Sequence, residues 1–531
     1  MGGYLMPASV SQLILSIFVL FAAYGLFKLF QLIALDINSP IRDLPGPPSK
    51  SFLFGNMIEM KAQDGTLETY IAKYGDAMKY WDMLGVTRLC TVDLKAINYV
   101  LMHSNDYQKP EPVIYHLQRI VGQGLLVVEG DVHKQRRKIL NPAFGPLQIR
   151  QLTEIFVDKA IELRDVWNST IQKQSKSKNA ATVDAISWLN RVTLDIVGCA
   201  GFDYDFQALY SEHSKNELHR AFDTMYHAIL NFELIHIIRS LVPLLRFWPS
   251  PSDSKLKQAK DTVFRIGGTL MERSKKNAMA YGKSNTDRDI LSLLTRANID
   301  PDVPTNQRMS DEDVLSQIPT FMLAGHETIT TGTAWALYSI ARHKDMQSKL
   351  REELLSIPTD SPSMDVLNGL HYLDNIVRES LRLHPPVPET LRVAMKDDYL
   401  PLSKPFKDRN GGQTLSIPIR PINLAESTWG KDAWEFNPDR WDNLPEAVSS
   451  IPGVWGNLMS FLGGPRSCIG YRFALVEMKA LLFTLIRAFE IDLAVPPENV
   501  RGTMGLRRPT LTSDPVNPNQ LPLVIRPVVR S

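Results

Sequence analysis

Cysteine is scarce in this sequence of 531 residues, where it occurs only as Cys90, Cys199 and Cys468. Three thiols far apart in the chain argue against a disulfide framework and against a zinc site built from paired thiolates, and they suit a reducing compartment. Excess charge is lacking too, because 59 Lys and Arg nearly cancel 57 Asp and Glu. The net charge of +2 therefore gives no electrostatic indication of a nucleic-acid partner.

Apolar residues are plentiful at 44%, which favours a large folded core over disorder. The longest weakly polar run, residues 5–27, is long enough to cross a bilayer of about 30 Å, so we expect a transmembrane signal anchor there. No small-residue cleavage pattern follows it, and Lys28, Arg42 and Lys50 all come after the run. This asymmetry favours an uncleaved single-pass anchor with the rest of the chain in the cytosol.

Residues 28–50 are predicted to form a stiff, proline-rich linker, because LPGPPS at Leu44–Ser49 fixes the backbone and removes donors. A domain of residues 51–531 follows. Its hydrophobic pattern is mostly helical, interrupted by short β-like segments such as Tyr80–Val92 and Gln413–Ile419. We therefore predict a mainly α fold with small β-sheets.

One predicted helix is unusually long. Ser310 and Asp313 form a capping-box pattern, and the apolar-rich run after them continues to about His343. Pro319 is expected to bend this helix. Gly325 lies inside it, where glycine costs about 1 kcal/mol relative to alanine, so we expect a functional reason for this residue.

The stretch FLGGPRSCIG, Phe461–Gly470, surrounds Cys468 with glycines and an arginine. The glycines allow a tight turn and close approach to a flat ligand, and a helix beginning near Tyr471 would point its positive end at the sulfur. A functional thiolate needs such a dipole, backbone donors or a metal, because burial alone raises the pKa of a thiol. The alternative is an inert buried cysteine in a glycine turn.

This stretch matches F-x-x-G-x-R-x-C-x-G through Phe461, Gly464, Arg466, Cys468 and Gly470, and it resembles the haem-ligand loop of the cytochrome P-450 monooxygenases. The resemblance covers nearly the whole chain and implies the cytochrome P-450 fold, preceded by one transmembrane helix. It implies haem b (iron protoporphyrin IX) as cofactor, with Cys468 as the axial thiolate on the metal. Arg466 would bind a haem propionate.

Within the long helix, Ala324–Thr328 resembles the A-G-x-[DE]-T motif of the same family. The resemblance gives Gly325 the role of opening room over iron, and gives Glu327 and Thr328 the catalytic role of delivering protons to bound dioxygen. Ile329 departs from the Ser or Thr that many members carry there. The alternative is a polar helix face on which Thr328 bonds back to its own turn.

Another predicted helix, Tyr372–Leu383, carries Glu379 and Arg382, which match the family's E-x-x-R. With Arg440 of the segment FNPDRW they would form a buried structural ion-pair network. Taken alone, the motif fits equally a solvated surface pair that contributes about 0.2–0.5 kcal/mol.

Three further residues are expected to bind the propionates by resemblance. His133 and Arg137 occupy the places of the family's W-x-x-x-R, and a histidine can still donate a hydrogen bond. Arg392 matches a propionate-binding arginine more loosely, and an ordinary surface arginine is the alternative. Lys134, Arg136 and Lys138 form a basic cluster on the same helix, suited either to an acidic redox partner or to solvent.

The resemblance implies a monooxygenase at the endoplasmic reticulum membrane that takes electrons from an NADPH-cytochrome reductase, with a cytochrome b-type protein as a further donor. It would insert one oxygen atom of O2 into an apolar small molecule, by hydroxylation or epoxidation, and we expect a terpenoid or other fungal specialised metabolite. Substrate contacts are expected around Pro112–Leu126 and before Ala324, and the run Phe232–Pro249 either rests on the membrane or packs as core helices. A reductase-independent haem-thiolate isomerase or dehydratase and a haem sensor are the alternatives.

Overall fold

The structure is a computed structural model. It describes residues 41–174, 179–210, 216–230, 250–281, 288–299, 308–403, 414–503 and 505–528, with isolated positions between 12 and 39 and at 239, 245, 246 and 304. The predicted anchor, residues 5–27, and the run Phe232–Pro249 fall largely outside the described residues. In the described part of the chain, no helix is both long and apolar enough to cross a membrane.

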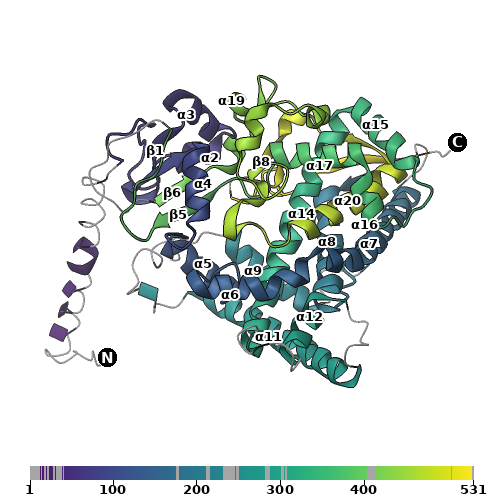
Figure 1. Ribbon diagram of the computed structural model, residues 1–531, viewed down its shortest axis with the longest axis horizontal. Coiled ribbons are helices and arrows are strands. Elements are labelled where there is room, and N and C mark those ends of the chain that lie inside the picture. Colours follow the sequence, from purple (N-terminus) through teal and green to yellow (C-terminus); the bar gives the residue numbers. More distant parts are fainter. Residues whose placement is uncertain are drawn as a thin grey trace, which may run out of the picture.

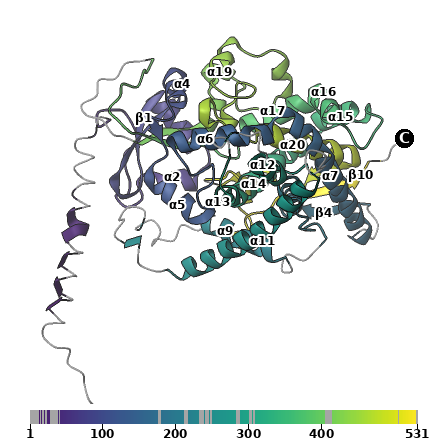
Figure 2. The ribbon, with the colours of Figure 1, turned by 60° about the horizontal axis from the view of Figure 1, so that its bottom comes forward.

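Helices dominate the fold, as the hydrophobic period predicted. Figure 1 shows α14 in the interior beside α8, α17 and α20, and in the turned view of Figure 2 it still lies inside, with α11 along the lower edge. The helices are α2 (Met57–Ala62), α3 (Thr66–Tyr74), α4 (Leu94–Met102), α5 (Glu111–Val121), α6 (Gly130–Leu140), α7 (Pro146–Gln174), α8 (Ala185–Phe202), α9 (Glu217–Leu230), α11 (Pro251–Tyr281), α12 (Ile290–Ile299), α13 (Asp311–Leu315), α14 (Gln317–Arg342), α15 (Lys344–Leu355), α16 (Met364–Gly369), α17 (His371–Leu383), α18 (Ile419–Asn423), α19 (Glu426–Trp429) and α20 (Tyr471–Ala488).

The strands form small sheets at the margins of the helical body. One sheet has the order β1-β2-β6-β5-β3, with only β2 and β6 parallel, and Figure 1 shows it beside α2, α3 and α4. The others have the orders β4-β10-β7 and β8-β9. The strands are β1 (Ala77–Trp81), β2 (Thr87–Thr91), β3 (Tyr107–Gln108), β4 (Ala181–Asp184), β5 (Thr390–Ala394), β6 (Thr414–Ile417), β7 (Phe489–Leu493), β8 (Val500–Gly502), β9 (Pro509–Leu511) and β10 (Pro522–Pro527).

The main core forms around the C-terminal half of α14, where every residue from Ile329 to Ala341 is buried. A helix segment that is buried all round needs other helices to enclose it, and α8, α17 and α20 do so here. α7 packs on α20 and extends this core outward. The helix that carries the A-G-x-E-T motif is therefore fixed on all sides at its C-terminal half.

The prediction of one continuous helix from Ser310 to His343 is wrong at its first turn. The structure has two helices, α13 and α14, that meet at Ser316. Pro319 explains the break, because it lacks the N–H that would bond to the carbonyl of Leu315, where α13 ends. The predicted cap is present, since the Ser310 side chain accepts a hydrogen bond from the Asp313 N–H at 3.1 Å.

Candidate active site

Close backbone contacts leave no room for a side chain at two positions of the cysteine loop, and a Cβ on Gly463 would lie 1.7 Å from the carbonyl oxygen of Pro452. Gly464 has φ +67°, and a Cβ there would lie 2.6 Å from the carbonyl oxygen of Leu101, so a side chain would collide with α4. Further along, the Cys468 N–H donates to the carbonyl of Phe461 at 2.8 Å, and α20 begins at Tyr471 as predicted. The loop thus holds the cysteine at the N-terminus of a buried helix.

The Cys468 thiol faces an internal space. Burial raises the pKa of this thiol. The residue nevertheless has exposed surface, so it lies deep in the protein without being covered by other side chains. The Gly470 N–H and the guanidinium of Arg137 act in the opposite direction on the thiol pKa but do not outweigh burial. A further positive charge next to the sulfur, such as a metal ion, would favour the thiolate.

The N-terminal half of α14 flanks the same region. Ala324 is exposed although it lies on an otherwise enclosed helix. Phe144 connects this helix to the cysteine loop, because its ring centroid lies 5.3 Å from that of Phe321 on α14 and a Cβ on Gly470 would approach it to 3.8 Å. Phe144 therefore packs between the N-terminal half of α14 and the cysteine loop.

A group of buried cations gathers around a single carboxylate near the cysteine loop. Arg466 pairs with Glu129 and donates to the carbonyl of Val128 at 2.8 Å, and Lys109 lies 3.0 Å from Glu129. Arg392 is buried next to them, and burial, reinforced by Arg466, lowers its pKa to about 10. Burial and the two arginines likewise lower the pKa of Lys109 to about 8.

This group fits the cofactor that the sequence implied. Lys109, Arg392 and Arg466 carry three positive charges where Glu129 supplies one negative charge, and uncompensated buried charge is costly. Haem b carries two carboxylates, which would offset the excess. The sequence predicted Arg392 and Arg466 here but missed Lys109 and Glu129, because no local pattern joins these residues to Arg466, more than 300 positions away.

His133 and Arg137 lie on α6 on the approach to the same region. Burial lowers the pKa of His133 to about 3, so its ring is neutral, and among the described residues it makes no side-chain hydrogen bond. It therefore keeps one ring N–H for a ligand. Arg137 donates to the carbonyl of Ser467 at 2.5 Å and to Asn141 Oδ1 at 2.8 Å, which places it against the cysteine loop.

The structure brings Glu379, Arg382 and Arg440 together. The carboxylate of Glu379 receives two hydrogen bonds from Arg382, at 2.7 and 2.9 Å, and one from Arg440 at 2.9 Å. The Glu379 and Arg382 side chains have no exposed surface. This is a buried network rather than the solvated surface pair that the motif alone allowed.

The network supports the cysteine loop through the backbone. Arg382 donates to the carbonyl of Asn423 at 3.1 Å. The Asn423 side chain in turn accepts from the Met459 N–H at 3.0 Å and donates to Ser460 Oγ at 2.9 Å, and Ser460 donates to the carbonyl of Leu381 at 2.7 Å. α17 thereby fixes the residues that immediately precede Phe461.

The A-G-x-E-T residues have contacts that the motif did not reveal. Thr328 Oγ1 donates to the carbonyl of Ala324 at 2.6 Å, so its hydroxyl is bonded to its own turn, which was the alternative interpretation. A Cβ on Gly325 would lie 3.1 Å from Val197 of α8. This glycine therefore makes room for a neighbouring helix, while the room over iron that the resemblance implied stays a prediction.

Glu327 is buried and paired with Arg508, which lies just before β9 and was not predicted as a site residue. Sequence reasoning had no signal for this pair, because 181 positions separate its members.

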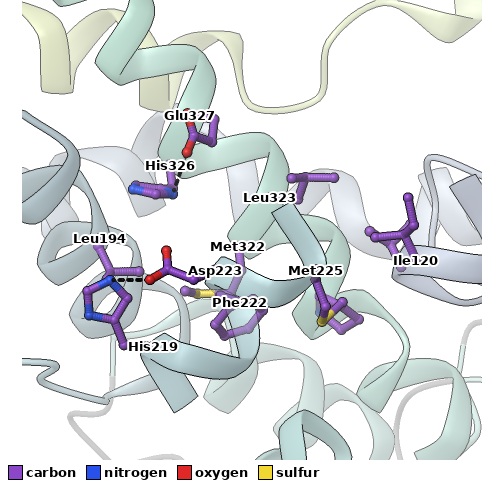
Figure 3. A pocket seen from close by; sticks show the side chains of 12 residues that line it. Ile120, Leu194, His219, Phe222, Asp223, Met225, Met322, Leu323, His326 and Glu327 are labelled. Carbon is purple, nitrogen blue, oxygen red and sulfur yellow. Dashed lines mark ion pairs between the residues drawn. The ribbon is translucent and has the colours of Figure 1, made fainter. Parts of the chain in front are cut away.

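A cavity lies against the same part of α14, and Figure 3 shows its wall. Its internal volume is small, about 20 Å³, which is room for little more than one water molecule. Most of its lining is apolar, and His219, Asp223, His326 and Glu327 are the charged or titratable groups among the side chains that form it. Ile120 and Val121 of α5, with Pro319, Met322 and Leu323 of α14, come from the two segments where substrate contacts were expected.

Comparison with known proteins agrees with this geometry. A sequence model of the family described as Cytochrome P450 matches residues 45–513. Two cytochrome P450 monooxygenases of Postia placenta, numbered 205 and 128, are 45% and 46% identical to the chain, and the alignments cover 98% and 96% of this chain and 99% and 96% of theirs. A ganoderic acid synthetase of Ganoderma lucidum is 31% identical over 91% of this chain and 94% of its own. Together with the cysteine loop and the cation group beside it, these matches show that the chain belongs to the cytochrome P450 family of haem-binding monooxygenases.

Proposed function

We propose that this cytochrome P450 monooxygenase is a membrane-bound enzyme that takes electrons from an NADPH-cytochrome reductase and hydroxylates or epoxidises an apolar small molecule. The observation that carries the proposal is the Cys468 thiol, accessible inside the protein next to a buried excess of positive charge. This combination suits a metal porphyrin with two carboxylates. An inert cysteine in a glycine turn would not require the excess positive charge.

When bound, the haem supplies an iron that activates dioxygen. Cys468 Sγ is the protein atom that would bind this iron, and the loop already directs the Gly470 N–H at the sulfur. Arg466, Arg392 and the free N–H of His133 would hold the propionates. Lys109 then stays with Glu129, 3.0 Å away.

Proton supply falls to α14. Glu327 is the acid nearest the exposed Ala324 on this helix, and the Thr328 hydroxyl can turn from the Ala324 carbonyl toward the interior by rotation about χ1. An acid and an alcohol at adjacent positions can pass a proton while each returns to its starting form. A sensor or an isomerase does not need this pair.

The wall of the pocket beside Glu327 is mainly apolar, which favours an apolar substrate, and such a substrate would need more room than this small pocket alone provides. The relative from Ganoderma lucidum is named for ganoderic acid, which favours a secondary metabolite, with a terpenoid as our specific proposal.

The membrane and the redox partner are proposed from charge and exposure. Phe52, Leu53, Phe54 and Ile58 are exposed apolar side chains close to the predicted anchor, where they would meet lipid at the endoplasmic reticulum. Lys134 and Lys138 are exposed on α6 and suit an acidic reductase or a cytochrome b-type donor. Arg136 does not belong to this surface, because it pairs with Asp313 of α13, so the predicted three-residue cluster is corrected to two.

Microsomes that contain this protein and a reductase test the proposal when they are incubated with a panel of apolar terpenoids and analysed for products heavier by one oxygen atom. The proposal expects such a product only when NADPH is present. Turnover without NADPH and reductase would instead establish an isomerase or dehydratase, and ligand binding without NADPH consumption would establish a sensor.

A further inference from the structure

Glu327 has two neighbours, Arg508 and His326, to which the motif assigns no role. Arg508 pairs with Oε2, and the Nδ1 atom of His326 lies 3.7 Å from Oε1. The exposed fractions of the Arg508 and Glu327 side chains are 7% and 5%. Figure 3 shows the imidazole and the carboxylate side by side on the cavity wall.

The protonation of His326 follows from its other ring nitrogen. Nε2 lies 3.0 Å from the carbonyl oxygen of Asn190 on α8, and a carbonyl only accepts, so Nε2 carries the hydrogen. Burial lowers the pKa of this histidine to about 3, with Arg508 contributing, so the ring is neutral and Nδ1 presents a lone pair. That lone pair lies 3.7 Å from Oε1, too far for a direct hydrogen bond, and it offers an acceptor to a proton on Oε1 once the two side chains approach each other.

The two oxygens of Glu327 therefore have different environments. Oε2 faces a permanent positive charge, which favours the ionised carboxylate. Oε1 faces a neutral acceptor, which favours a proton on that oxygen. The other titratable groups that line this cavity, among the residues that the structure describes, are His219 and Asp223 of α9, which lie 3.7 Å apart, Nε2 to Oδ2.

We propose that Arg508 and His326 are positioning residues for proton transfer by Glu327, with Arg508 anchoring Oε2 and His326 directing each incoming proton to Oε1. The proton comes from solvent, the O–H bond forms at Oε1, and it breaks when the proton passes onward, so the carboxylate and both neighbours end unchanged. This inference rests on the proposed monooxygenase function only for the destination of the proton.

Variants of Arg508 test the anchor. Arg508→Gln removes the charge, Arg508→Lys keeps it, and Arg501→Gln removes an exposed charge from the neighbouring strand β8 as a matched control. The haem-loaded protein is titrated by infrared difference spectroscopy, with the Glu327→Gln variant identifying the carboxyl band. We expect the protonated Glu327 band of Arg508→Gln to persist to a pH higher by about 1 to 3 units, and that of Arg508→Lys and Arg501→Gln to match the wild type.

His326→Phe tests the second contact, because it keeps a ring and removes both nitrogens. The proposal expects a larger share of NADPH electrons in peroxide and a changed solvent isotope effect on product formation. If the cavity histidine served substrate binding instead, affinity would fall while the isotope effect and the peroxide share stayed as in the wild type, and the proposal would be overturned.

A double variant keeps the test decisive if Arg508→Gln folds poorly. If Arg508 affects proton transfer through Glu327, as proposed, Arg508→Gln combined with Glu327→Gln should give the same peroxide share as Glu327→Gln alone. A further loss in the double variant, or an unshifted infrared titration in Arg508→Gln, would refute the anchoring role. The infrared result does not depend on any substrate, so it stands apart from failure of the proposed function, which would appear as absence of oxygenated product in every variant.

Discussion

The guanidinium of Arg382 donates two parallel hydrogen bonds to the carboxylate of Glu379, from Nε to Oε2 at 2.9 Å and from Nη2 to Oε1 at 2.7 Å. Both side chains belong to α17, and neither has exposed surface. Glu379 and Arg382 therefore compensate each other's buried charge together with Arg440. Through Asn423 and Ser460, hydrogen bonds connect this network to the residues that precede the cysteine loop.

Breaking this pair should destabilise the whole domain. Arg382→Leu leaves Glu379 buried without its main partner, and loss of one member of a buried pair costs about 3–5 kcal/mol. Arg150→Leu is the control, because Arg150 and Asp365 pair on the surface with side-chain exposures of 51% and 70%, and such pairs contribute about 1 kcal/mol or less. Denaturant unfolding of the haem-loaded proteins measures both, and equal losses in the two variants would contradict the role of the network.

Local motifs predicted the cysteine loop and α17 well, because their residues are close in sequence and their spacing determines which side chains share a turn. Contacts across the fold could not be predicted in this way. The pairing of Glu327 with Arg508 and the packing of Gly325 on Val197 depend on how α14 packs against α8 and the C-terminal strands, and the pairing of Arg136 with Asp313 depends on how α13 packs against α6. A single sequence does not specify how these elements pack against one another.

Cys468→Ala should abolish the thiolate-ligated spectrum of the reduced protein with carbon monoxide. The alanine has no sulfur to bind the metal, while the Phe461 carbonyl still accepts from the backbone N–H at position 468. Cys199→Ala is the matched control, since Cys199 lies on α8 away from the loop. Persistence of the spectrum in Cys468→Ala, or its loss in Cys199→Ala, would show that another residue is the ligand.

Thr328→Ala should shift NADPH electrons from product to peroxide, because the hydroxyl next to Glu327 is lost from the proton path. We expect a several-fold decrease in product per NADPH, which is smaller than the about 10²-fold that marks the lower end of general acid–base effects. Thr330→Ala removes a hydroxyl from the same helix that is bonded to Thr193 at 2.8 Å, and it serves as control. Parallel measurements of product and peroxide decide the outcome, and equal ratios in both variants would exclude a special role for Thr328.

The burial of His384 leads us to expect that the folded protein loses stability as the pH falls. Burial, with the nearby Arg507 and Arg420 adding to it, holds the pKa of His384 well below its ordinary value of about 6.5. The unfolded chain therefore binds a proton more readily, so stability is fully present above pH about 6.5 and is lost as the pH falls below it.

His384→Phe should reduce this pH dependence. The phenyl ring can keep the stack on Trp335, whose ring centroid lies 4.1 Å away at an interplanar angle of 7°, and it cannot titrate. The exposed His103 changed to Gln is the control. Unfolding free energies measured from pH 7.5 to 5 should fall less steeply in His384→Phe than in the wild type or the control, and parallel slopes would contradict the prediction.

Reversing the charge of the two exposed lysines of α6, Lys134 and Lys138, tests whether they form the redox-partner surface. Lys134→Glu with Lys138→Glu should slow association with an acidic reductase by about tenfold or more at low salt, because charged patches steer encounter. Lys255→Glu with Lys257→Glu makes the same change in charge on α11, where both lysines are exposed, and should have little effect. Electron transfer rates at rising reductase concentration measure association, and added salt should remove the difference between the two double variants because it screens surface charges. An equal slowing in both would mean that net charge, rather than this face of α6, governs the encounter.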